Sequence, residues 1–391
     1  MKIVGRHYIT AQPVAVEIAG ERIAGVEACD TTDHEMPWVA PGFVDLQVNG
    51  YGGQEFTAED LTAEKAIAIG DCLTRFGVTR FCPTVTTEGC ESLMASMATI
   101  RRACRQSPEF AAMVPGIHLE GPYISAQDGA RGAHPACHCR PPSVDEFDLL
   151  NQAAGGLISL VTFSPEFPGS SEFIAALVAR GVKVAIGHTA ATGVQIAAAA
   201  DAGATISTHL GNGAHSWLRR HPNYLWDQLA EDRLTATLIV DGHHLPPAVV
   251  KTFVRAKSPD RIALVSDLSG YAGLPVGSYE TALCPVEILD DGRLVVAGQR
   301  DLLAGAGEPI GKGIVGMMRF ASVDRPTAIA MASAHPARML GVEVAALAVG
   351  DRADVVTFDL PLDNAGLPTA LCVRQTVVAG RLAMGEHACA L

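Results

Sequence analysis

The residues that best indicate chemistry lie at the ends of three short apolar segments. Glu120 ends the apolar part of GIHLEGPYIS (residues 116–125), His188 ends that of VKVAIGHTAA, and His209 ends that of ATISTHLGNG. Such segments predict buried strands that run into loops. A buried carboxylate needs a partner, and Glu120 alone could simply pair with an arginine. Two histidines and one glutamate at successive strand ends are, however, the ligand set of a catalytic zinc with one open position for water.

Further polar residues follow other predicted strands, namely Gln47, Asn49, His244 and Asp267. Taken singly, each has a structural explanation. The two amides could bond to turn backbone, Asp267 could cap the next helix, and a lone histidine is more often a core or surface residue. Their shared position favours function, because the carboxyl ends of barrel strands converge on one face.

The elements that must position these residues alternate between strand and helix across residues 42–344. Repeated β-α units of this total length predict a (β/α)8 barrel of the TIM type. An open doubly wound sheet is the alternative, but there the polar residues would gather at one switch point. Residues 1–41 and 345–391 instead read as short strands with glycine turns. They predict a small β-sandwich domain that is built from both termini, with the barrel inserted between them.

Composition restricts the partners of this chain. Its 391 residues suffice for a large core, and 29 basic against 42 acidic residues give a net charge of −13. No lysine or arginine run is present, which argues against nucleic acid but not against a small anionic substrate. Neither a membrane-spanning apolar run nor a signal-peptide core is found. The ten cysteines include no C-x-x-C pair, and Cys137 and Cys139 flank His138 too closely for a zinc-finger pair. We therefore expect reduced thiols and a cytoplasmic protein.

Motifs across residues 38–358 make the assignment more specific, because they occur in a characteristic order: APGFVDLQVNGYGG, GVTRFCPTVTT, GIHLEGPYIS, RGAHP, IGHTAA, STHLGNGAH, IVDGHH, LVSD and SAHPARMLG. In these motifs the chain resembles the N-acetylglucosamine-6-phosphate deacetylases of the amidohydrolase superfamily. The most specific motif is GIHLEGP, whereas SAHPARMLG is common across the superfamily.

The resemblance implies one divalent metal per chain, usually zinc, bound by Glu120, His188 and His209. Most of the superfamily carries His-x-His after the first strand, where a second metal binds. This chain has Gln47 and Asn49 at those two positions. An amide oxygen is a weaker zinc ligand than an imidazole, so we expect a mononuclear site. Gln47 and Asn49 remain the candidates for a second-metal or water contact.

The resemblance also implies a reaction, the hydrolysis of N-acetylglucosamine 6-phosphate to glucosamine 6-phosphate and acetate. Asp267, in LVSD, matches the catalytic aspartate that moves the proton of water to the leaving amine. His134, in RGAHP, matches a residue that donates a hydrogen bond to the oxyanion. A homodimer is implied as well. The positions that match substrate-binding residues are Asn212, Gly213, Arg220 and His244.

Arg220 lies eleven residues after His209, the offset at which the family has its phosphate-binding arginine. An arginine can bind phosphate oxygens through two hydrogen bonds. The plain alternative is that Arg219 and Arg220 form a solvated basic pair on a loop.

Several departures from the family pattern leave the exact substrate open. The usual Thr-His-Leu-Phe-Asn-Ala-Met reads THLGNGA at residues 208–214, Leu268 follows Asp267, and residues 295–311 read VVAGQRDLLAGAGEPIG. Two alternatives therefore stand beside the deacetylase. One is an amidohydrolase that acts on another N-acyl amino sugar or on an N-acyl amino acid. The other is a non-catalytic binding protein on the same fold, which would be expected to have lost a ligand or the aspartate.

Overall fold

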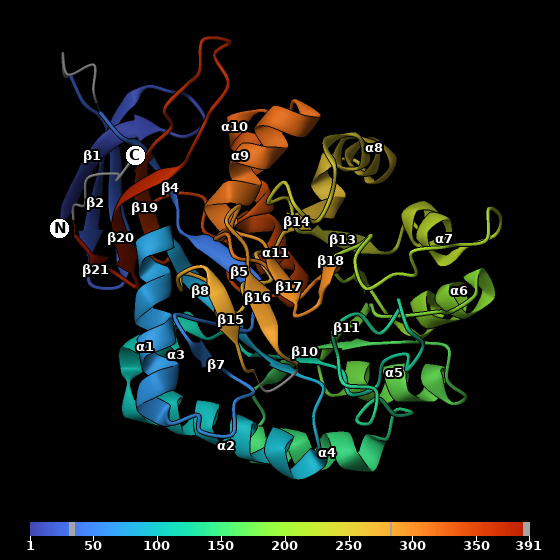
Figure 1. Ribbon diagram of the computed structural model, residues 1–391. Coiled ribbons are helices and arrows are strands. Elements are labelled where there is room, and N and C mark those ends of the chain that lie inside the picture. Colours follow the sequence, from blue (N-terminus) through green and yellow to red (C-terminus); the bar gives the residue numbers. More distant parts are fainter. Residues whose placement is uncertain (31–35, 282–283, 386–391) are drawn as a thin grey trace.

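A computed structural model of the protein describes residues 1–30, 36–281 and 284–385 (Figure 1). Within these ranges, eight parallel strands form one sheet, ordered β14-β13-β12-β11-β10-β9-β8-β5. The strands follow one another in the sheet in the order of the chain, which is the arrangement of a barrel. They are β5 (Phe43–Val48), β8 (Val78–Thr86), β9 (Ile117–Glu120), β10 (Ile158–Phe163), β11 (Lys183–Ile186), β12 (Ile206–Ser207), β13 (Thr235–Leu238) and β14 (Ile262–Leu264).

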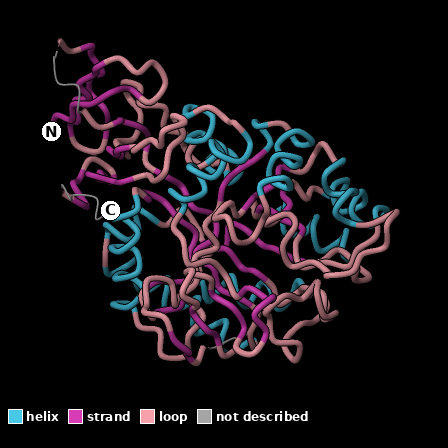
Figure 2. The backbone as a smooth tube through the Cα atoms, turned by 45° about the horizontal axis from the view of Figure 1, so that its top comes forward, coloured by secondary structure: helices cyan, strands magenta, loops and turns pink. Residues whose placement is uncertain are grey.

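The sheet closes through the residues that follow its first and last strands. Asp267 donates its backbone N–H to the carbonyl of Gln47 over 3.0 Å, and Asn49 donates to the carbonyl of Leu268 over 2.9 Å. Val48 and Leu268 form a parallel bridge between these two bonds. Figure 2 shows the strands at the centre with helices around them. The predicted (β/α)8 barrel is confirmed.

The helices around the barrel bury one face each and begin and end at recognisable signals. In α6, for example, Thr192 and Gln195 form a capping box, and Gly203 ends the helix in the left-handed region at φ 114°. The helices are α1 (Ala63–Leu73), α2 (Cys90–Gln106), α3 (Pro108–Met113), α4 (Val144–Ala154), α5 (Ser170–Ala179), α6 (Gly193–Ala202), α7 (Tyr224–Ala230), α8 (Pro247–Lys257), α9 (Ile310–Ala321), α10 (Arg325–Met331) and α11 (Ala334–Leu340).

Both ends of the chain contribute to a second sheet, seen where blue and red strands lie together in Figure 1. In the described residues it has seven strands, ordered β21-β20-β19-β4-β1-β2-β3. The prediction that both termini build a separate β-sheet is confirmed, and the domain bounds at residues 41 and 345 stay a prediction. Its strands are β1 (Lys2–His7), β2 (Pro13–Ala19), β3 (Arg22–Ala28), β4 (Trp38–Pro41), β19 (Val355–Asp359), β20 (Cys372–Val378) and β21 (Arg381–Met384).

Charged groups join this sheet to the barrel. Arg80 on β8 pairs with Asp354, at 2.9 Å between Nε and Oδ2, and both side chains are almost fully buried. The guanidinium of Arg325 on α10 lies 3.4 Å from the ring centroid of Trp38 on β4. Removal of either partner of the Arg80–Asp354 pair would leave an uncompensated buried charge, so the contact is costly to break.

A third sheet was not expected from the sequence. Its four antiparallel strands, β15 (Gly277–Tyr279), β16 (Val286–Ile288), β17 (Leu294–Val296) and β18 (Gln299–Leu303), lie between β14 and α9. We call residues 271–306 the β-insert. Its C-terminal end is hydrogen-bonded to the segment that follows β14. The backbone N–H of Ala306 donates to the carbonyl of Asp267, and its carbonyl accepts from the N–H of Ser269, both over 2.9 Å. A two-stranded sheet, β6 (Gly50–Tyr51) and β7 (Gln54–Glu55), follows β5.

Two further observations bear on the sequence predictions. No helix in the described part of the chain has the length and apolarity needed to cross a membrane. Among the described residues, eight cysteines are free thiols and Cys372 is disulfide-bonded, which departs from the expectation of reduced thiols.

Candidate active site

The predicted metal ligands lie at the carboxyl ends of three barrel strands. Glu120 is the last residue of β9, and His188 and His209 follow β11 and β12 by two residues. The backbones of His188, His209 and Asp267 are left-handed, with φ of 49°, 28° and 53°. Non-glycine residues rarely adopt such angles, and strained positions of this kind cluster at active sites. The chain holds these side chains in place at some conformational cost.

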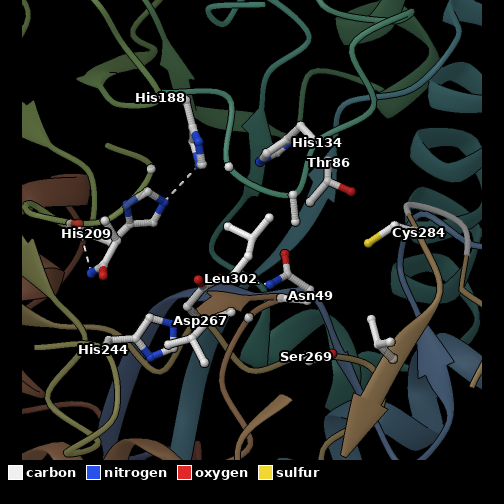
Figure 3. A pocket seen from close by; sticks show the side chains of 18 of the residues that line it. Asn49, Thr86, His134, His188, His209, His244, Asp267, Ser269, Cys284 and Leu302 are labelled. Carbon is white, nitrogen blue, oxygen red and sulfur yellow. Dashed lines mark hydrogen bonds between the residues drawn. The ribbon is translucent and has the colours of Figure 1, made fainter. Parts of the chain in front are cut away.

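Three donor atoms meet at one point above the barrel. Glu120 Oε1 lies 3.0 Å from Nε2 of His209 and 3.4 Å from Nε2 of His188, and the two Nε2 atoms are 3.1 Å apart. Figure 3 shows the two imidazoles turned toward each other. Ligands bonded to zinc at about 2.0–2.1 Å in a tetrahedron are separated by about 3.3–3.4 Å. The donor set therefore fits a single zinc-sized cation.

The charges of the cluster also fit a cation. Burial alone would raise the pKa of Glu120, but hydrogen bonds and charges from His188 and His209 hold it well below its usual range. Burial alone would lower the pKa of His209, and the hydrogen bond and charge of Glu120 raise it instead. A buried, ionised carboxylate between two imidazoles requires positive charge, which a metal ion supplies more directly than a proton.

His134 is the other histidine near the cluster. Its ring lies 4.4 Å from that of His188, and Glu120, His134 and His188 offer donor atoms that all lie within 4.8 Å of one another. Nε2 of His134 is nevertheless 4.0 Å from Glu120 Oε2, so the set that includes His209 is the tighter one. Nδ1 of His134 is hydrogen-bonded to Thr87 Oγ1 at 2.9 Å. Burial and the neighbouring His188 lower the pKa of His134 to about 3, so the ring is neutral and carries one N–H.

Gln47 and Asn49 lie against the two carboxylates of the site. The amide nitrogen of Gln47 donates to Glu120 Oε1 over 2.8 Å and to Asp267 Oδ1 over 3.0 Å. Asn49 donates from Nδ2 to the same Oδ1 of Asp267 over 2.8 Å. An N–H group cannot ligate a metal, so in this arrangement Gln47 serves as a bridge between acid groups. The Oδ1 atom of Asn49 is buried and has no hydrogen-bond partner, which leaves it free to accept from a water or a substrate.

Asp267 combines burial with close negative charge. Burial and the nearby Glu120 carboxylate raise its pKa to about 6. Its backbone is held on both sides, since its N–H bonds to Gln47 of the barrel and its carbonyl to Ala306 of the β-insert. A carboxylate with a pKa close to neutrality is suited to both accepting and returning a proton.

The cluster lies at the base of a cavity of about 390 Å³, the size of a small-molecule site. Asn212, Gly213 and His244 line this cavity. Their contact with a substrate stays a prediction. His244 is oriented by Asp241, whose Oδ2 lies 2.7 Å from Nδ1 of the ring. Gly213 has φ 55°, and a Cβ there would come within 2.5 Å of His188 Nδ1, so only glycine allows this approach.

Arg220 is not brought into the cavity of a single chain. It is exposed, and its backbone carbonyl accepts a hydrogen bond from Asn223. The arginines that do line the cavity are Arg293 and Arg300 of the β-insert, which pair with Asp291 at 2.8 Å and Glu287 at 2.9 Å.

The β-insert is the part of the site that sequence reasoning missed. Cys284, Arg293 and the run from Arg300 to Gly305 line the cavity. Figure 3 shows Leu302 and Cys284 among the side chains that line the cavity. The sequence indicated only that the stretch 295–311 departs from the family pattern. The signal that could have located it is the repeated Gly and Asp turns between short apolar runs at 277–303.

The fold and this site define a class of hydrolase, and comparison with known proteins identifies it. The model of the amidohydrolase family matches residues 38–383. The chain belongs to the amidohydrolase family, and the prediction of a hydrolase that acts on an amide bond is confirmed.

Individual relatives narrow the class. The chain is 32% identical over 372 residues, 94% of each chain, to N-acetylgalactosamine-6-phosphate deacetylase of Escherichia coli O157:H7. It is 34% identical over 359 residues, 88% of this chain and 83% of the relative, to N-acetylglucosamine-6-phosphate deacetylase of Homo sapiens. The crystal structure of N-acetyl-D-glucosamine-6-phosphate deacetylase from Mycobacterium smegmatis superposes with a TM-score of 0.83 at 32% identity over 95% of each chain. The predicted resemblance to these deacetylases is confirmed.

Proposed function

We propose that the protein removes the acetyl group of N-acetylglucosamine 6-phosphate, yielding glucosamine 6-phosphate and acetate. The observation that carries this proposal is the convergence of Glu120, His188 and His209 beside Asp267 at the base of a sugar-sized cavity. The non-catalytic alternative would require the loss of one of these groups, and all four are in place. Relatives that match this chain over most of its length are named as deacetylases of N-acetylamino sugar 6-phosphates.

Glu120, His188 and His209 would hold one divalent metal, which we propose to be zinc. When bound there, such an ion lowers the pKa of a water molecule and polarises the amide carbonyl. Asp267 then accepts the proton of the attacking water and returns it to the leaving amine. Asn49 and Gln47 keep Oδ1 of Asp267 turned toward the cluster. The ring N–H of His134 donates to the oxygen that becomes negative in the tetrahedral intermediate.

A second candidate substrate is the epimer N-acetylgalactosamine 6-phosphate. The relative from E. coli, which spans 94% of this chain, is named for that sugar. Both sugars present the same acetamide and phosphate, so the metal cluster cannot distinguish them. The distinction lies with the cavity wall formed by the β-insert and the 211–214 loop, both of which depart from the family pattern. An N-acyl amino acid is the third candidate.

One assay separates these candidates. Metal-loaded protein is given both 6-phosphorylated N-acetylamino sugars, the two sugars without phosphate, and an N-acetylated amino acid. We expect the phosphorylated glucosamine derivative to have the highest kcat/KM. A higher kcat/KM for the galactosamine derivative would show that N-acetylgalactosamine 6-phosphate is the preferred substrate. Equal kcat/KM values with and without phosphate would show that the enzyme does not recognise the phosphate group.

The phosphate has two sets of candidate partners. Arg220 matches the family position, whereas Arg293 and Arg300 line the cavity of the single chain. We propose that Arg220 acts within a homodimer in which its loop meets the cavity mouth of a second copy. Arg220→Ala should then abolish most of the preference for phosphorylated sugar. If Arg300→Ala does so and Arg220→Ala does not, the phosphate is held by the β-insert.

Exposed apolar side chains near Arg220 support a dimer. Trp217 on the same loop is 93% exposed, Trp226 on α7 52% and Val194 on α6 81%. Helices α6 and α7 contact each other, and exposed apolar side chains of this kind are candidates for contact with a second copy. Sedimentation should show a dimer, and Trp217→Glu should shift it toward monomer. A wild-type monomer at micromolar concentration would contradict this arrangement.

The cytoplasmic location stays a prediction that cell fractionation can test.

A further inference from the structure

A chain of hydrogen-bonded side chains crosses the barrel interior directly beneath the metal cluster. Thr84 Oγ1 on β8 lies 3.4 Å from Nδ1 of His118 on β9. Nε2 of the same ring lies 2.8 Å from Thr162 Oγ1 on β10, which is 2.7 Å from Thr208 Oγ1 beside β12. We call these four residues the polar belt.

The belt is shielded from solvent. Thr84 and Thr162 are 0% exposed, His118 1% and Thr208 5%. Each hydroxyl bonds to a neighbour, and both ring nitrogens of His118 are engaged. A fully satisfied buried network of this kind rigidifies its surroundings, because any displacement leaves a polar group without a partner.

The belt contacts the backbone segments that carry the metal ligands. Thr208 directly precedes His209. His118 precedes Glu120 by two positions, so both side chains leave β9 on the same face. Gly187 precedes His188 and packs on the belt, since a Cβ there would lie 2.8 Å from Thr162 and 2.9 Å from Thr208.

The other end of the belt contacts the segment that holds the catalytic aspartate. Val48 donates its backbone N–H to Thr84 Oγ1 over 3.0 Å. Val48 lies between Gln47 and Asn49, the two residues that bond to Asp267. The belt thus connects the carboxyl ends of β5, β8, β9, β10 and β12 through one continuous series of hydrogen bonds.

We propose that the polar belt sets the spacing of the three metal ligands and that Thr162, with His118, is a positioning residue for the metal site. This inference rests on the proposed metal-dependent function. Thr162 is the informative member, because β10 carries no predicted ligand and Thr162→Val changes the hydroxyl alone. Its backbone pairing with Glu120 and the contact of its methyl group with Gly187 are kept in that variant. Groups outside the ligand set that orient it typically change metal affinity or activity by about 10- to 100-fold when removed.

The test compares Thr162→Val, which keeps the shape but removes the hydroxyl, with Thr162→Ser, which keeps the hydroxyl. Zinc affinity is measured by competition with a chelator, so the readout does not depend on any substrate. We expect affinity to fall about 10-fold or more in the valine variant and to recover in the serine variant. The matched control is Thr79→Val. Thr79 lies at the opposite end of β8 from Thr84, is equally buried, and donates its hydroxyl to the carbonyl of Phe43 on β5. This control should lower thermal stability without changing zinc affinity.

A second variant keeps the test decisive if Thr162→Val fails to fold. Thr208→Val removes the terminal hydroxyl of the belt and should weaken zinc binding by a similar factor. Wild-type zinc affinity in a folded Thr162→Val or Thr208→Val variant would overturn the proposal. That result is distinct from failure of the proposed function, in which wild-type protein binds zinc but hydrolyses no N-acetylamino sugar phosphate.

Discussion

Gln47 donates a hydrogen bond from its amide nitrogen to Oδ1 of Asp267 over 3.0 Å. The same nitrogen donates to Glu120 over 2.8 Å, so one amide lies between two buried carboxylates. Gln47→Leu keeps a similar volume and removes the bridge. We expect kcat to fall by about 10-fold or more, since Asp267 loses a partner that orients it. Steady-state kinetics and metal analysis check this. Wild-type kcat in the metal-loaded variant would show that Asn49 alone orients the aspartate.

The metal ligands lead to a second prediction. His188→Ala or His209→Ala should remove most of the bound metal and nearly all activity, because a three-ligand site has no spare ligand. Elemental analysis of purified protein should give one divalent ion per chain in the wild type and much less in either variant. His221→Ala, at an exposed histidine, is the control and should keep the metal. Two ions per wild-type chain would contradict the mononuclear site.

The aspartate can be separated from the metal. Asp267→Asn keeps the shape and the contacts of the side chain but removes the proton acceptor. Metal should remain bound while kcat falls by about 100-fold or more, the usual scale for loss of general acid–base catalysis. The measurement is turnover in protein of verified metal content. Unchanged turnover would mean that another group moves the proton.

His134 acts on the carbonyl oxygen in the proposed mechanism. His134→Phe keeps a ring of similar size beside His188 and removes the N–H donor. We expect kcat to fall by about 100- to 1000-fold with little change in KM, because the bond to the oxyanion forms only in the transition state. Loss of metal in this variant would instead indicate that His134 is a ligand, and zinc titration distinguishes the two outcomes.

A lysine far from the site makes stability depend on pH. Lys257 is 3% exposed and donates to the carbonyls of Glu231 and Leu234, and burial lowers its pKa from 10.5 to about 8. Between about pH 8 and 10.5 the unfolded chain therefore binds more protons than the native one, and this group's contribution to stability rises with pH. The melting temperature of wild type minus that of Lys257→Met should increase over this window. A constant or falling difference would contradict the assigned shift.

The convergence of the three strand-end side chains could be predicted because its signal is local. Each of Glu120, His188 and His209 follows an apolar segment, and a parallel barrel brings such ends together whatever the loops do. The same reasoning located Gln47, Asn49 and Asp267. It did not predict that Gln47 would face both acids, since the orientation of an amide depends on partners from other strands.

The β-insert was marked in the sequence only by its Gly and Asp turns, and the polar belt was not marked at all. Strands β15, β16 and β17 have three residues each, too few for an alternating pattern to emerge. Threonines such as Thr84 and Thr162 are common in strands, so nothing in the sequence marks them as a network. Arg220 matched the family position, yet it is exposed and does not line the cavity of the single chain.

The seven-stranded sheet has a consequence for how the chain folds as it is synthesised. Val39 and Ala40 on β4 pair with Thr357 and Val356 on β19, residues from opposite ends of the chain. The edge of β4 that faces β19 therefore stays open until residues 355–358 have left the ribosome, while the barrel strands that precede them can already assemble. Unpaired strand edges and late, non-local contacts make folding slow and favour aggregation. The nascent chain thus passes through a stage in which a folded barrel carries an incomplete sheet with an unpaired strand edge. We expect chaperones to bind at that stage.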